Sequence, residues 1–334
     1  MPRIGMNPNR GLRTMLPSAR INLAVLTYLP DEIGYFEHRF DVTRMCLESL
    51  IANTPQPYDL LVFDNGSCPE LVNYLNDLYG SEKIQYLVLS KKNVGKMAAL
   101  QMIFNSLPGE VIAYTDDDVF FLPGWLEAHL KILQTYPMAG LVTGFYIRSH
   151  MRYATQSIER FARQAYVRVE RGNLISKDIE QHYIDNMGRT KEQYLEETQG
   201  LEDVRFEYKS IPALASAGHH QFVARRQVML EALPKERDGM LMGRMVELET
   251  RIDDLGYLRL STHEPVTHLL GNEVDDRILE EASQFGISPV RTKPLISQVG
   301  SPGLLNKIPL VRRLLQHLYN RLHHVLYSVQ QESK

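Results

Sequence analysis

Cysteine, excess positive charge and long apolar runs are all scarce in this chain of 334 residues. Its two cysteines, Cys46 and Cys68, are too few to build a disulfide framework or a zinc site by themselves, which favours a reducing compartment. The formal net charge is -3. This balance argues against bulk attraction to nucleic acid, which needs a basic footprint, so we expect no nucleic-acid partner.

No apolar stretch approaches the roughly 18 residues that a membrane span needs. Residues 1–19 are polar and aperiodic, carry Arg3, Arg10 and Arg13, and lack the apolar core of a signal peptide, so we expect a flexible leader. With 44% hydrophobic and 23% charged residues, the composition is that of an ordinary globular protein. We therefore expect a cytoplasmic protein.

Apolar runs of strand length alternate with helical patterns through the first 146 residues. The expected strands are residues 21–27, 59–63, 84–89, 111–114 and 140–146, and the expected helices are 42–50, 69–79, 97–106 and 125–136. This alternation is typical of right-handed βαβ units. It predicts an α/β fold with a mostly parallel sheet flanked by helices, and we assign residues 20–146 to its nucleotide-binding half.

Three consecutive aspartates follow the apolar run at residues 111–114. Because side chains alternate in an extended chain, Asp116 and Asp118 should project to one side and Asp117 to the other. Two carboxylates directed at one point repel unless a cation lies between them, and Mg²⁺ or Mn²⁺ prefers oxygen ligands. The alternative is a solvated acidic turn or a set of helix caps.

Other polar groups follow the preceding strands. They are Thr27, Asp64 and the segment Asn93-Val94-Gly95-Lys96. Ligands of parallel sheets bind at the carboxyl ends of the strands, so these residues and the aspartates should share one edge. Taken singly, Asp64 to Ser67 could be a tight turn with Gly66 at positive φ, and Lys96 an exposed lysine at a helix entry. Together they favour a nucleotide site, with Lys96 and the helix N-terminus meeting phosphate.

The second half of the chain is less regular. Residues 147–210 are charged and predicted to be mainly helical, either as an acceptor-binding insert or as a solvated excursion. Residues 211–272 return to the core, with strands at 211–217 and 257–261 and a helix at about 240–255. His268 follows the last of these strands and is either a hydrogen-bonded structural residue or a third metal ligand.

The C-terminal region is expected to be a linker over residues 273–305 and a basic amphipathic helix over residues 306–334. In the latter, apolar residues such as Leu314, Leu318 and Leu322 recur at helical spacing with arginines mostly off that stripe. The helix could pack on the protein or a second protomer. It could instead lie on the inner face of a membrane with its cations on anionic headgroups, giving a peripheral membrane contact.

The motifs together resemble GT-A fold glycosyltransferases of the family 2 type, well over residues 20–146 and moderately over 211–270. The matching parts, in order, are Thr27-Tyr28, Asp64-Asn-Gly-Ser67, Asn93-Val-Gly-Lys96, Asp116-Asp-Asp118 followed by Pro123-Gly-Trp125-Leu126, and Gly218 through Arg226. The resemblance implies that the nucleotide-sugar is contacted by Thr27, Tyr28, Asp64, Asn93, Gly95, Lys96, Asp116 and Asp117. It implies that Mn²⁺ or Mg²⁺ is held by Asp118, Asp116 and His268. The acceptor side would contain Trp125, Gly218 and His219.

The implied reaction is metal-dependent, inverting transfer of a sugar from a nucleoside-diphosphate sugar to an acceptor hydroxyl, on a glycan, a lipid-linked molecule, an anionic acceptor or a small molecule. The catalytic carboxylate departs from the family pattern. Where relatives have a Glu-Asp pair this chain has Arg244 and Met245, so the nearest carboxylates, Glu247 and Glu249, become the candidates. The alternatives are a sugar nucleotidyltransferase and a non-catalytic nucleotide-sugar-binding protein.

Overall fold

The computed structural model describes residues 5–6, 10, 20–234, 241–242 and 245–287. The described strands are β1 (Ile21–Thr27), β2 (Asp59–Asp64), β3 (Tyr86–Leu89), β4 (Val111–Asp116), β5 (Val119–Phe121), β6 (Ala139–Thr143), β7 (Arg168–Gly172), β8 (Asp203–Tyr208), β9 (Ile211–Ala215), β10 (Gln221–Arg225), β11 (Leu258–Thr262) and β12 (Thr267–Leu269). The helices are α1 (Arg39–Ala52), α2 (Pro69–Gly80), α3 (Lys96–Ser106), α4 (Trp125–Thr135), α5 (Gln156–Ala162), α6 (Lys177–Asn186), α7 (Lys191–Thr198), α8 (Arg226–Ala232), α9 (Met245–Asp254) and α10 (Asp276–Gln284), with short 3-10 turns η1 (Gly34–Phe36) and η2 (Arg148–Arg152).

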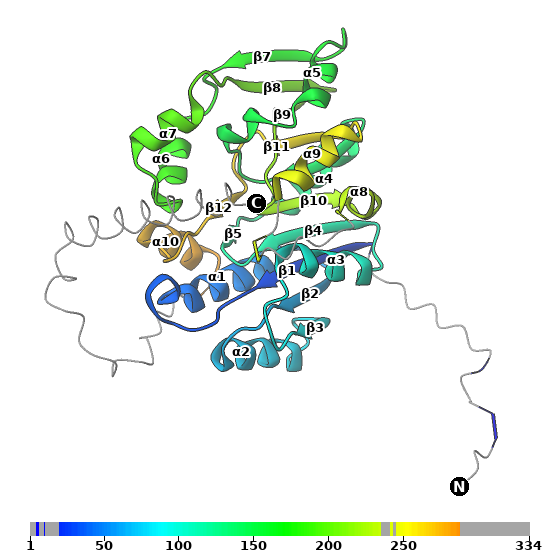
Figure 1. Ribbon diagram of the computed structural model, residues 1–334, viewed down its shortest axis with the longest axis vertical. Coiled ribbons are helices and arrows are strands. Elements are labelled where there is room, and N and C mark those ends of the chain that lie inside the picture. The colour runs from blue at the N-terminus through cyan, green and yellow to red at the C-terminus, as the bar shows by residue number, and fades with distance from the viewer. Residues whose placement is uncertain (1–4, 7–9, 11–19, 235–240, 243–244, 288–334) are drawn as a thin grey trace, which may run out of the picture. The chain divides into compact units, whose positions relative to one another are not determined.

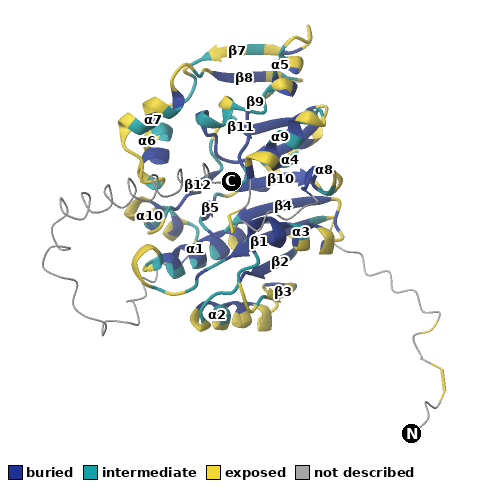
Figure 2. Cartoon of the chain, in the orientation of Figure 1, coloured by how far each residue is buried: buried dark blue, intermediate teal, exposed yellow. Residues whose placement is uncertain are grey.

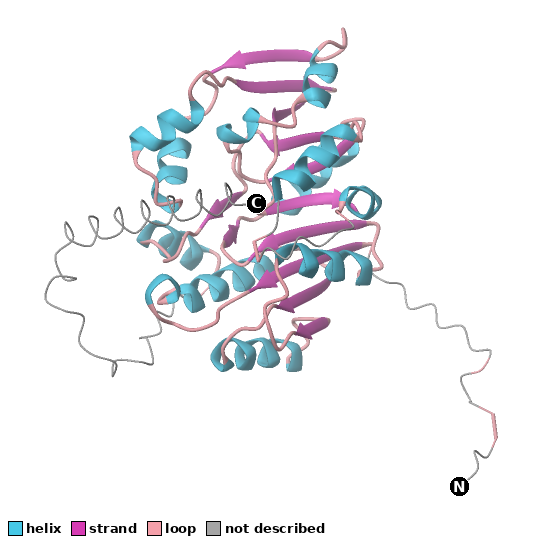
Figure 3. Cartoon of the chain, in the orientation of Figure 1, coloured by secondary structure: helices cyan, strands magenta, loops and turns pink. Residues whose placement is uncertain are grey.

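A large central sheet organises these elements in the order β3-β2-β1-β4-β10-β6-β11-β9-β8-β7 (Figures 1 and 3). Strands β3, β2, β1 and β4 are parallel, as are β6 and β11. Strand β10 lies antiparallel between β4 and β6, and β9, β8 and β7 continue the sheet in antiparallel pairs. The α/β fold predicted from the sequence, a sheet flanked by helices with parallel βαβ units at its start, is confirmed.

Strand β1 shows why the predicted strands read as unbroken apolar runs. Leu23 and Val25 pack into the core shared with α1 and α2, whereas Ala24 and Leu26 pack into the core on the α3 side. Because helices cover both faces of the sheet, residues on both faces of a central strand are apolar. A strand with one solvated face would instead have a polar residue at every second position. Figure 2 shows the central strands as buried and the outer surface of α2 as exposed.

The region predicted as a mainly helical insert, residues 147–210, contains helices and also two strands. Strands β7 and β8 pair antiparallel and extend the central sheet beyond β9. Their burial is uneven, with β7 largely exposed, so they lack the apolar run that marks the central strands. Helix α10 forms within residues 273–305, which the sequence had suggested as a linker, and its Ile278 and Ala282 are buried.

A second, two-stranded sheet joins β5, which follows the three aspartates, to β12, which precedes α10. Strand β12 pairs antiparallel with β5, so that His268 lies opposite Phe120, and the Leu270 N–H donates to the Asp118 carbonyl at 2.8 Å. This pairing holds the aspartate turn against β12. Among the described residues, no helix is long and apolar enough to cross a membrane. The predicted C-terminal helix, residues 306–334, lies outside the described residues.

Candidate active site

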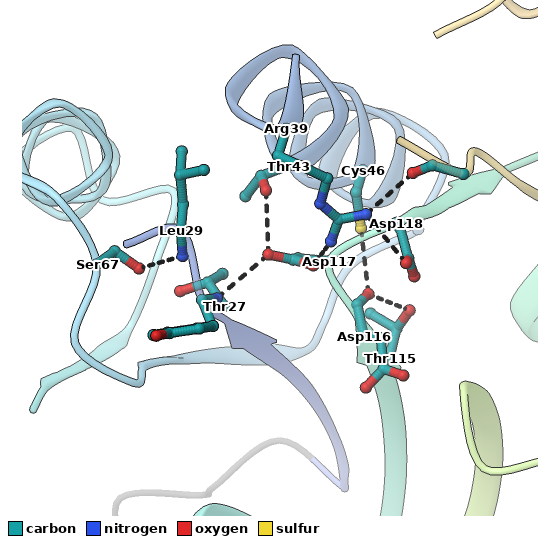
Figure 4. A network of polar contacts seen from close by, with 12 residues as sticks. Thr27, Leu29, Arg39, Thr43, Cys46, Ser67, Thr115, Asp116, Asp117 and Asp118 are labelled. Carbon is teal, nitrogen blue, oxygen red and sulfur yellow. Dashed lines mark hydrogen bonds and ion pairs between the residues drawn. The ribbon is translucent and has the colours of Figure 1, made fainter. Parts of the chain in front are cut away.

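The aspartate turn between β4 and β5 separates its three carboxylates as the alternation of an extended chain predicts. The Asp117 side chain is buried, whereas those of Asp116 and Asp118 are 22% and 35% exposed. Asp117 accepts hydrogen bonds from the Thr43 hydroxyl at 3.0 Å and from the Tyr28 N–H at 3.3 Å. It is therefore directed into the space between β1 and α1 (Figure 4). The other two carboxylates remain partly exposed at the sheet edge.

Arg39 at the start of α1 links two of the aspartates. Its Nη2 lies 2.5 Å from Asp117 Oδ1, and its Nη1 donates to Asp118 Oδ2 at 3.1 Å and to the Gly271 carbonyl at 2.9 Å. Burial disfavours the charged guanidinium, but Asp117 and then Asp118 hold the pKa of Arg39 above its ordinary value. This one side chain thus connects α1, the aspartate turn and the segment after β12.

Asp116 is compensated by a different cation. Lys96, the first residue of α3, places Nζ 2.5 Å from Asp116 Oδ2, and the Tyr114 hydroxyl donates to Oδ1 at 2.6 Å. Burial opposes ionisation, but Lys96 holds the pKa of Asp116 below its ordinary value. The Lys96 main-chain N–H donates to the Leu241 carbonyl at 2.6 Å, so in this conformation both the ammonium and the helix N-terminal amide have protein partners.

Asp64 shapes the loop after β2. The Asp64 side chain is buried, and its oxygens accept from the Thr27 hydroxyl at 3.2 Å and from the N–H groups of Gly66 and Ser67 at 3.2 and 3.1 Å. Gly66 has φ +93° and a Cβ there would lie 2.8 Å from the Lys92 carbonyl carbon, which explains the glycine. The tight turn with Gly66 at positive φ is confirmed.

The loop after β3 is tied to the Asp64 loop by amide side chains. Asn65 donates to Asn93 Oδ1 at 3.0 Å, and the Val94 N–H donates to Asn65 Oδ1 at 2.8 Å. The Gly95 N–H also donates to Asn93 Oδ1, at 2.8 Å. Thr27, Asp64, Asn93, Gly95 and Lys96 therefore come together at one sheet edge with the aspartates, as the strand order predicted.

Two groups predicted on the acceptor side have very different surroundings. Trp125 is 1% exposed, and its indole N–H donates to the Thr54 hydroxyl at 3.1 Å, so it fills the core beneath α4. Its burial leaves no indole surface for an acceptor in this conformation. His219 is partly exposed instead, and its Nδ1 lies 2.7 Å from Glu249 Oε1. Gly218 has no room for a side chain, because a Cβ would lie 2.5 Å from the His150 ring.

The two candidate bases, Glu247 and Glu249, also lie in different environments. Glu247 is exposed on the first turn of α9. Glu249 is fully buried, where Oε2 accepts from Arg259 Nη1 at 2.8 Å and from the Tyr153 hydroxyl at 2.6 Å. Burial works against its charge, but its partners, of which the hydrogen bond to His219 is the largest, hold the pKa of Glu249 at about 2. A buried carboxylate with this pKa is a poor direct proton acceptor.

His268 lines a cavity together with His182. Its Nε2 lies 3.5 Å from Glu281, its ring centroid is 5.0 Å from that of His182, and burial lowers the pKa of His268 to about 3. The cavity measures about 300 Å³ and is also lined by Arg277. No group of three or more His, Cys, Asp or Glu side chains within the described ranges is arranged to hold a metal ion. The structure therefore does not bring His268 into one cluster with Asp116 and Asp118.

The remaining carboxylate pair fits a divalent cation by its chemistry. Asp116 and Asp118 offer partly exposed oxygen donors at one edge, and Mg²⁺ or Mn²⁺ commonly uses one or two carboxylates together with waters and phosphate oxygens. A metal there would compete with Lys96 and Arg39 for these oxygens.

Four residues of this region were missed by the sequence analysis. Arg39 precedes the expected start of its helix, and His150 and Tyr153 lie in an insert without a clear pattern. Arg259 was detectable in principle, because a cation between the apolar Leu258 and Leu260 of a buried strand requires buried partners. Arg39 contacts Asp117 and Asp118, whereas Tyr153 and Arg259 contact Glu249. The His150 ring faces that of His219.

Comparison with known proteins identifies similarity over part of the chain. Residues 35–198 match the family model described as Glycosyl transferase family 2. An uncharacterized glycosyltransferase of Rickettsia bellii (strain RML369-C) is 24% identical over 126 residues, which are 38% of this chain and 17% of that protein. The chain thus spans about a sixth of the length of this curated relative.

Solved structures show weaker likeness. GalNAc-T7 with UDP, GalNAc and Mn²⁺ aligns with TM-score 0.44 and 12% identity, covering 78% of this chain and 47% of that one. S. aureus TarS 1–349 aligns with TM-score 0.43 and 11% identity, covering 74% and 59%. The mannosyltransferase PcManGT from Pyrobaculum calidifontis, in complex with GDP-Man and Mn²⁺, aligns with TM-score 0.31 and 19% identity, covering 39% and 36%.

Proposed function

Since residues 35–198 match the model of glycosyl transferase family 2, we propose that the chain transfers a sugar from a nucleoside-diphosphate sugar to an acceptor hydroxyl with inversion at the anomeric carbon. The observation that carries this proposal is the accessible pair Asp116 and Asp118 at the carboxyl edge of a parallel sheet, with Lys96 beside it. Such an edge is the usual ligand site of this architecture.

Asp116 and Asp118 would hold Mn²⁺ or Mg²⁺. When bound, this cation supplies positive charge against the charge that grows on the departing diphosphate. Lys96 lies at the same place and can donate to a phosphate oxygen once it leaves Asp116. Asp117 would act indirectly, because its buried carboxylate orients Arg39 and the Tyr28 N–H.

The donor base and ribose would lie along the linked loops after β1, β2 and β3. Asp64 accepts hydrogen bonds from the Gly66 and Ser67 amides, so we assign it the role of shaping the surface that the nucleobase contacts. Thr27, Tyr28 and Asn93 would lie next to this surface. His268 would bind the metal as a further ligand only if β12 moved.

The experiment that tests this proposal incubates the full chain with UDP-glucose, UDP-N-acetylglucosamine, UDP-N-acetylgalactosamine and GDP-mannose, with Mn²⁺, with Mg²⁺ or with EDTA. Metal-dependent release of nucleoside diphosphate supports a transferase. Formation of sugar phosphate and nucleoside triphosphate from pyrophosphate would instead identify a nucleotidyltransferase. A thermal shift with UDP or GDP but no turnover would identify a binding protein, because a ligand of the folded state raises its stability by mass action.

A further inference from the structure

Glu249 and His219 form a carboxylate–imidazole pair beside the aspartate edge. Glu249 Oε1 lies 2.7 Å from His219 Nδ1, while its other oxygen is held by Arg259 and Tyr153. The carboxylate is fully buried, and the His219 side chain is 28% exposed. One end of the pair is therefore fixed in the protein interior and the other reaches solvent.

The pairing determines which ring nitrogen of His219 is available. A carboxylate oxygen at 2.7 Å accepts the proton of Nδ1–H, so the neutral ring carries its lone pair on Nε2. The ring of His150 lies roughly parallel to that of His219, with centroids 6.3 Å apart and planes 17° apart. The ring is thus oriented as well as polarised.

Main-chain hydrogen bonds connect the residues next to His219 to the proposed donor site. The carbonyl of His220, the residue after His219, accepts from the Asp116 N–H at 2.8 Å. The next residue, Gln221, begins β10 opposite Thr115 of β4. His219, which carries the imidazole, is therefore the residue directly before a main-chain contact with the aspartate turn.

The ionisable groups next to His219 keep one protonation state near pH 7. Burial lowers the pKa of His150 to about 4 and that of His220 to about 3, so both rings stay neutral near pH 7. Glu249 stays ionised because its pKa is held at about 2. The charged and titratable groups that interact with His219 are Glu249, His150, His220 and Asp116. Arg259 and Tyr153 contact Glu249 in turn, and Lys96 contacts Asp116.

We propose that His219 is the catalytic base that removes the proton of the attacking hydroxyl, and that Glu249 is a positioning residue that fixes its tautomer and stabilises the imidazolium. This inference rests on the proposed glycosyl transfer. The sequence suggested a carboxylate as the base, and this proposal replaces it with a histidine that is hydrogen-bonded to a buried carboxylate. Many active sites orient an imidazole in this way.

The step conserves atoms and charge. The acceptor oxygen forms a bond to the anomeric carbon, and the bond between that carbon and the diphosphate oxygen breaks, so its electron pair leaves with the nucleoside diphosphate. The hydroxyl proton moves to His219 Nε2, which makes an imidazolium next to the Glu249 carboxylate. After product release the imidazolium returns its proton to solvent through its exposed side.

The experiment uses the full chain and the same four donors with Mn²⁺, with water as the acceptor, and follows release of UDP or GDP. We expect His219→Gln to lower kcat about 10²- to 10⁴-fold with the KM for donor changed less than about threefold. His263→Gln is the matched control, since His263 is another partly exposed histidine near a glutamate, and it should keep wild-type rates. Glu247→Gln tests the competing base and should also keep them.

Glu249→Gln tests the positioning role, and circular dichroism must first show that the variant folds, because the buried Arg259 loses its ionic partner. Loss of the negative charge beside the ring should lower kcat and move the acidic limb of the pH–rate profile to lower pH, because the imidazolium loses its ionic partner. Tyr153→Phe removes only one hydrogen bond from the other carboxylate oxygen and should keep kcat within about fivefold. An unshifted acidic limb in folded Glu249→Gln would overturn the positioning role.

The outcomes distinguish the two proposals. Absence of diphosphate release by the wild-type chain from all four donors counts against glycosyl transfer itself. Wild-type release with unchanged kcat in His219→Gln, or loss confined to Glu247→Gln, overturns the His219 assignment alone. Without turnover, ¹⁵N spectra of the histidine rings should show His219 as the Nδ1–H tautomer in the wild type, and the Nε2–H tautomer would contradict the proposed base.

Discussion

Arg39 and Asp117 form a buried ion pair with 2.5 Å between Nη2 and Oδ1, although 78 positions separate them in the chain. Their side chains are only 9% and 7% exposed. Since Arg39 also contacts Asp118, this pair sets the distance between α1 and the aspartate turn. Removing one partner of such a pair leaves an uncompensated buried charge, which is costly.

Arg39→Met should therefore destabilise the protein by about 3–5 kcal/mol. Arg20→Met is the matched control, because Arg20 pairs with Glu110 while both side chains are more than 70% exposed, and its loss should change stability by less than about 1 kcal/mol. Urea unfolding followed by circular dichroism measures both. Equal losses in the two variants would contradict the structural role of Arg39.

The buried histidines predict a loss of stability on acidification. His129 is fully buried, and burial lowers its pKa to about 4 although hydrogen bonds to Trp125 and Gln221 oppose the shift. Between pH 6.5 and 4 the unfolded chain binds this proton more strongly than the folded one, so stability should fall as pH decreases through this window. A shift of this size corresponds to about 3 kcal/mol.

His129→Gln keeps a polar group but cannot be protonated. We expect it to lose less stability than the wild type between pH 6.5 and 4, even if it is less stable at pH 7. The measurement is the free energy of unfolding of both proteins across this range. Parallel curves for the two proteins would show that His129 does not contribute to the pH dependence.

Gly66 tests the loop that Asp64 shapes. At φ +93° an alanine is strained, and its Cβ would lie 2.8 Å from the main chain at Lys92, so Gly66→Ala should cost about 1–3 kcal/mol and weaken binding of UDP or GDP. Gly124→Ala is the control, since Gly124 has φ +80° but nothing within 4 Å of a Cβ. Calorimetric titration should show weaker nucleotide binding in the first variant only. Equal nucleotide affinity in both variants would remove this loop from the proposed donor site.

The tail at residues 306–334 gives a prediction that depends on sequence alone. Its apolar stripe and flanking cations predict binding to anionic vesicles, so deleting it should reduce cosedimentation with phosphatidylglycerol vesicles but not with neutral phosphatidylcholine ones. Binding should also weaken as salt rises. An unchanged amount of vesicle-bound protein would favour packing of this helix on protein instead.

The sequence predicted the arrangement of the site better than its internal contacts. The runs at β1, β2 and β4 are apolar because both faces of the sheet are covered, so their ends could be aligned from local pattern alone. That alignment brought Asp64, Lys96 and the aspartates to one edge. It needed no knowledge of side-chain pairing.

The pairings themselves are long-range and left no local pattern. His219 and Glu249 are 30 positions apart, and periodicity cannot show that two polar side chains on different elements meet. The short strand β7 was missed for a related reason, because its mostly exposed, charged residues resemble a loop. Trp125 was predicted on the acceptor side from resemblance, but its burial depends on contacts with Thr54, which follows α1, and with Phe121 of β5.

Calorimetric titration of the wild type and of Asp118→Asn with UDP and GDP, each with Mn²⁺ and with EDTA, tests the central claim most directly. Asn keeps the size of the side chain but removes its charge, and the Asp118 side chain is 35% exposed, so the fold should persist. We expect the wild type to bind one nucleotide at least tenfold more tightly with Mn²⁺, and Asp118→Asn to lose that gain while binding in EDTA stays the same. An equal Mn²⁺-dependent gain in both proteins would contradict the account.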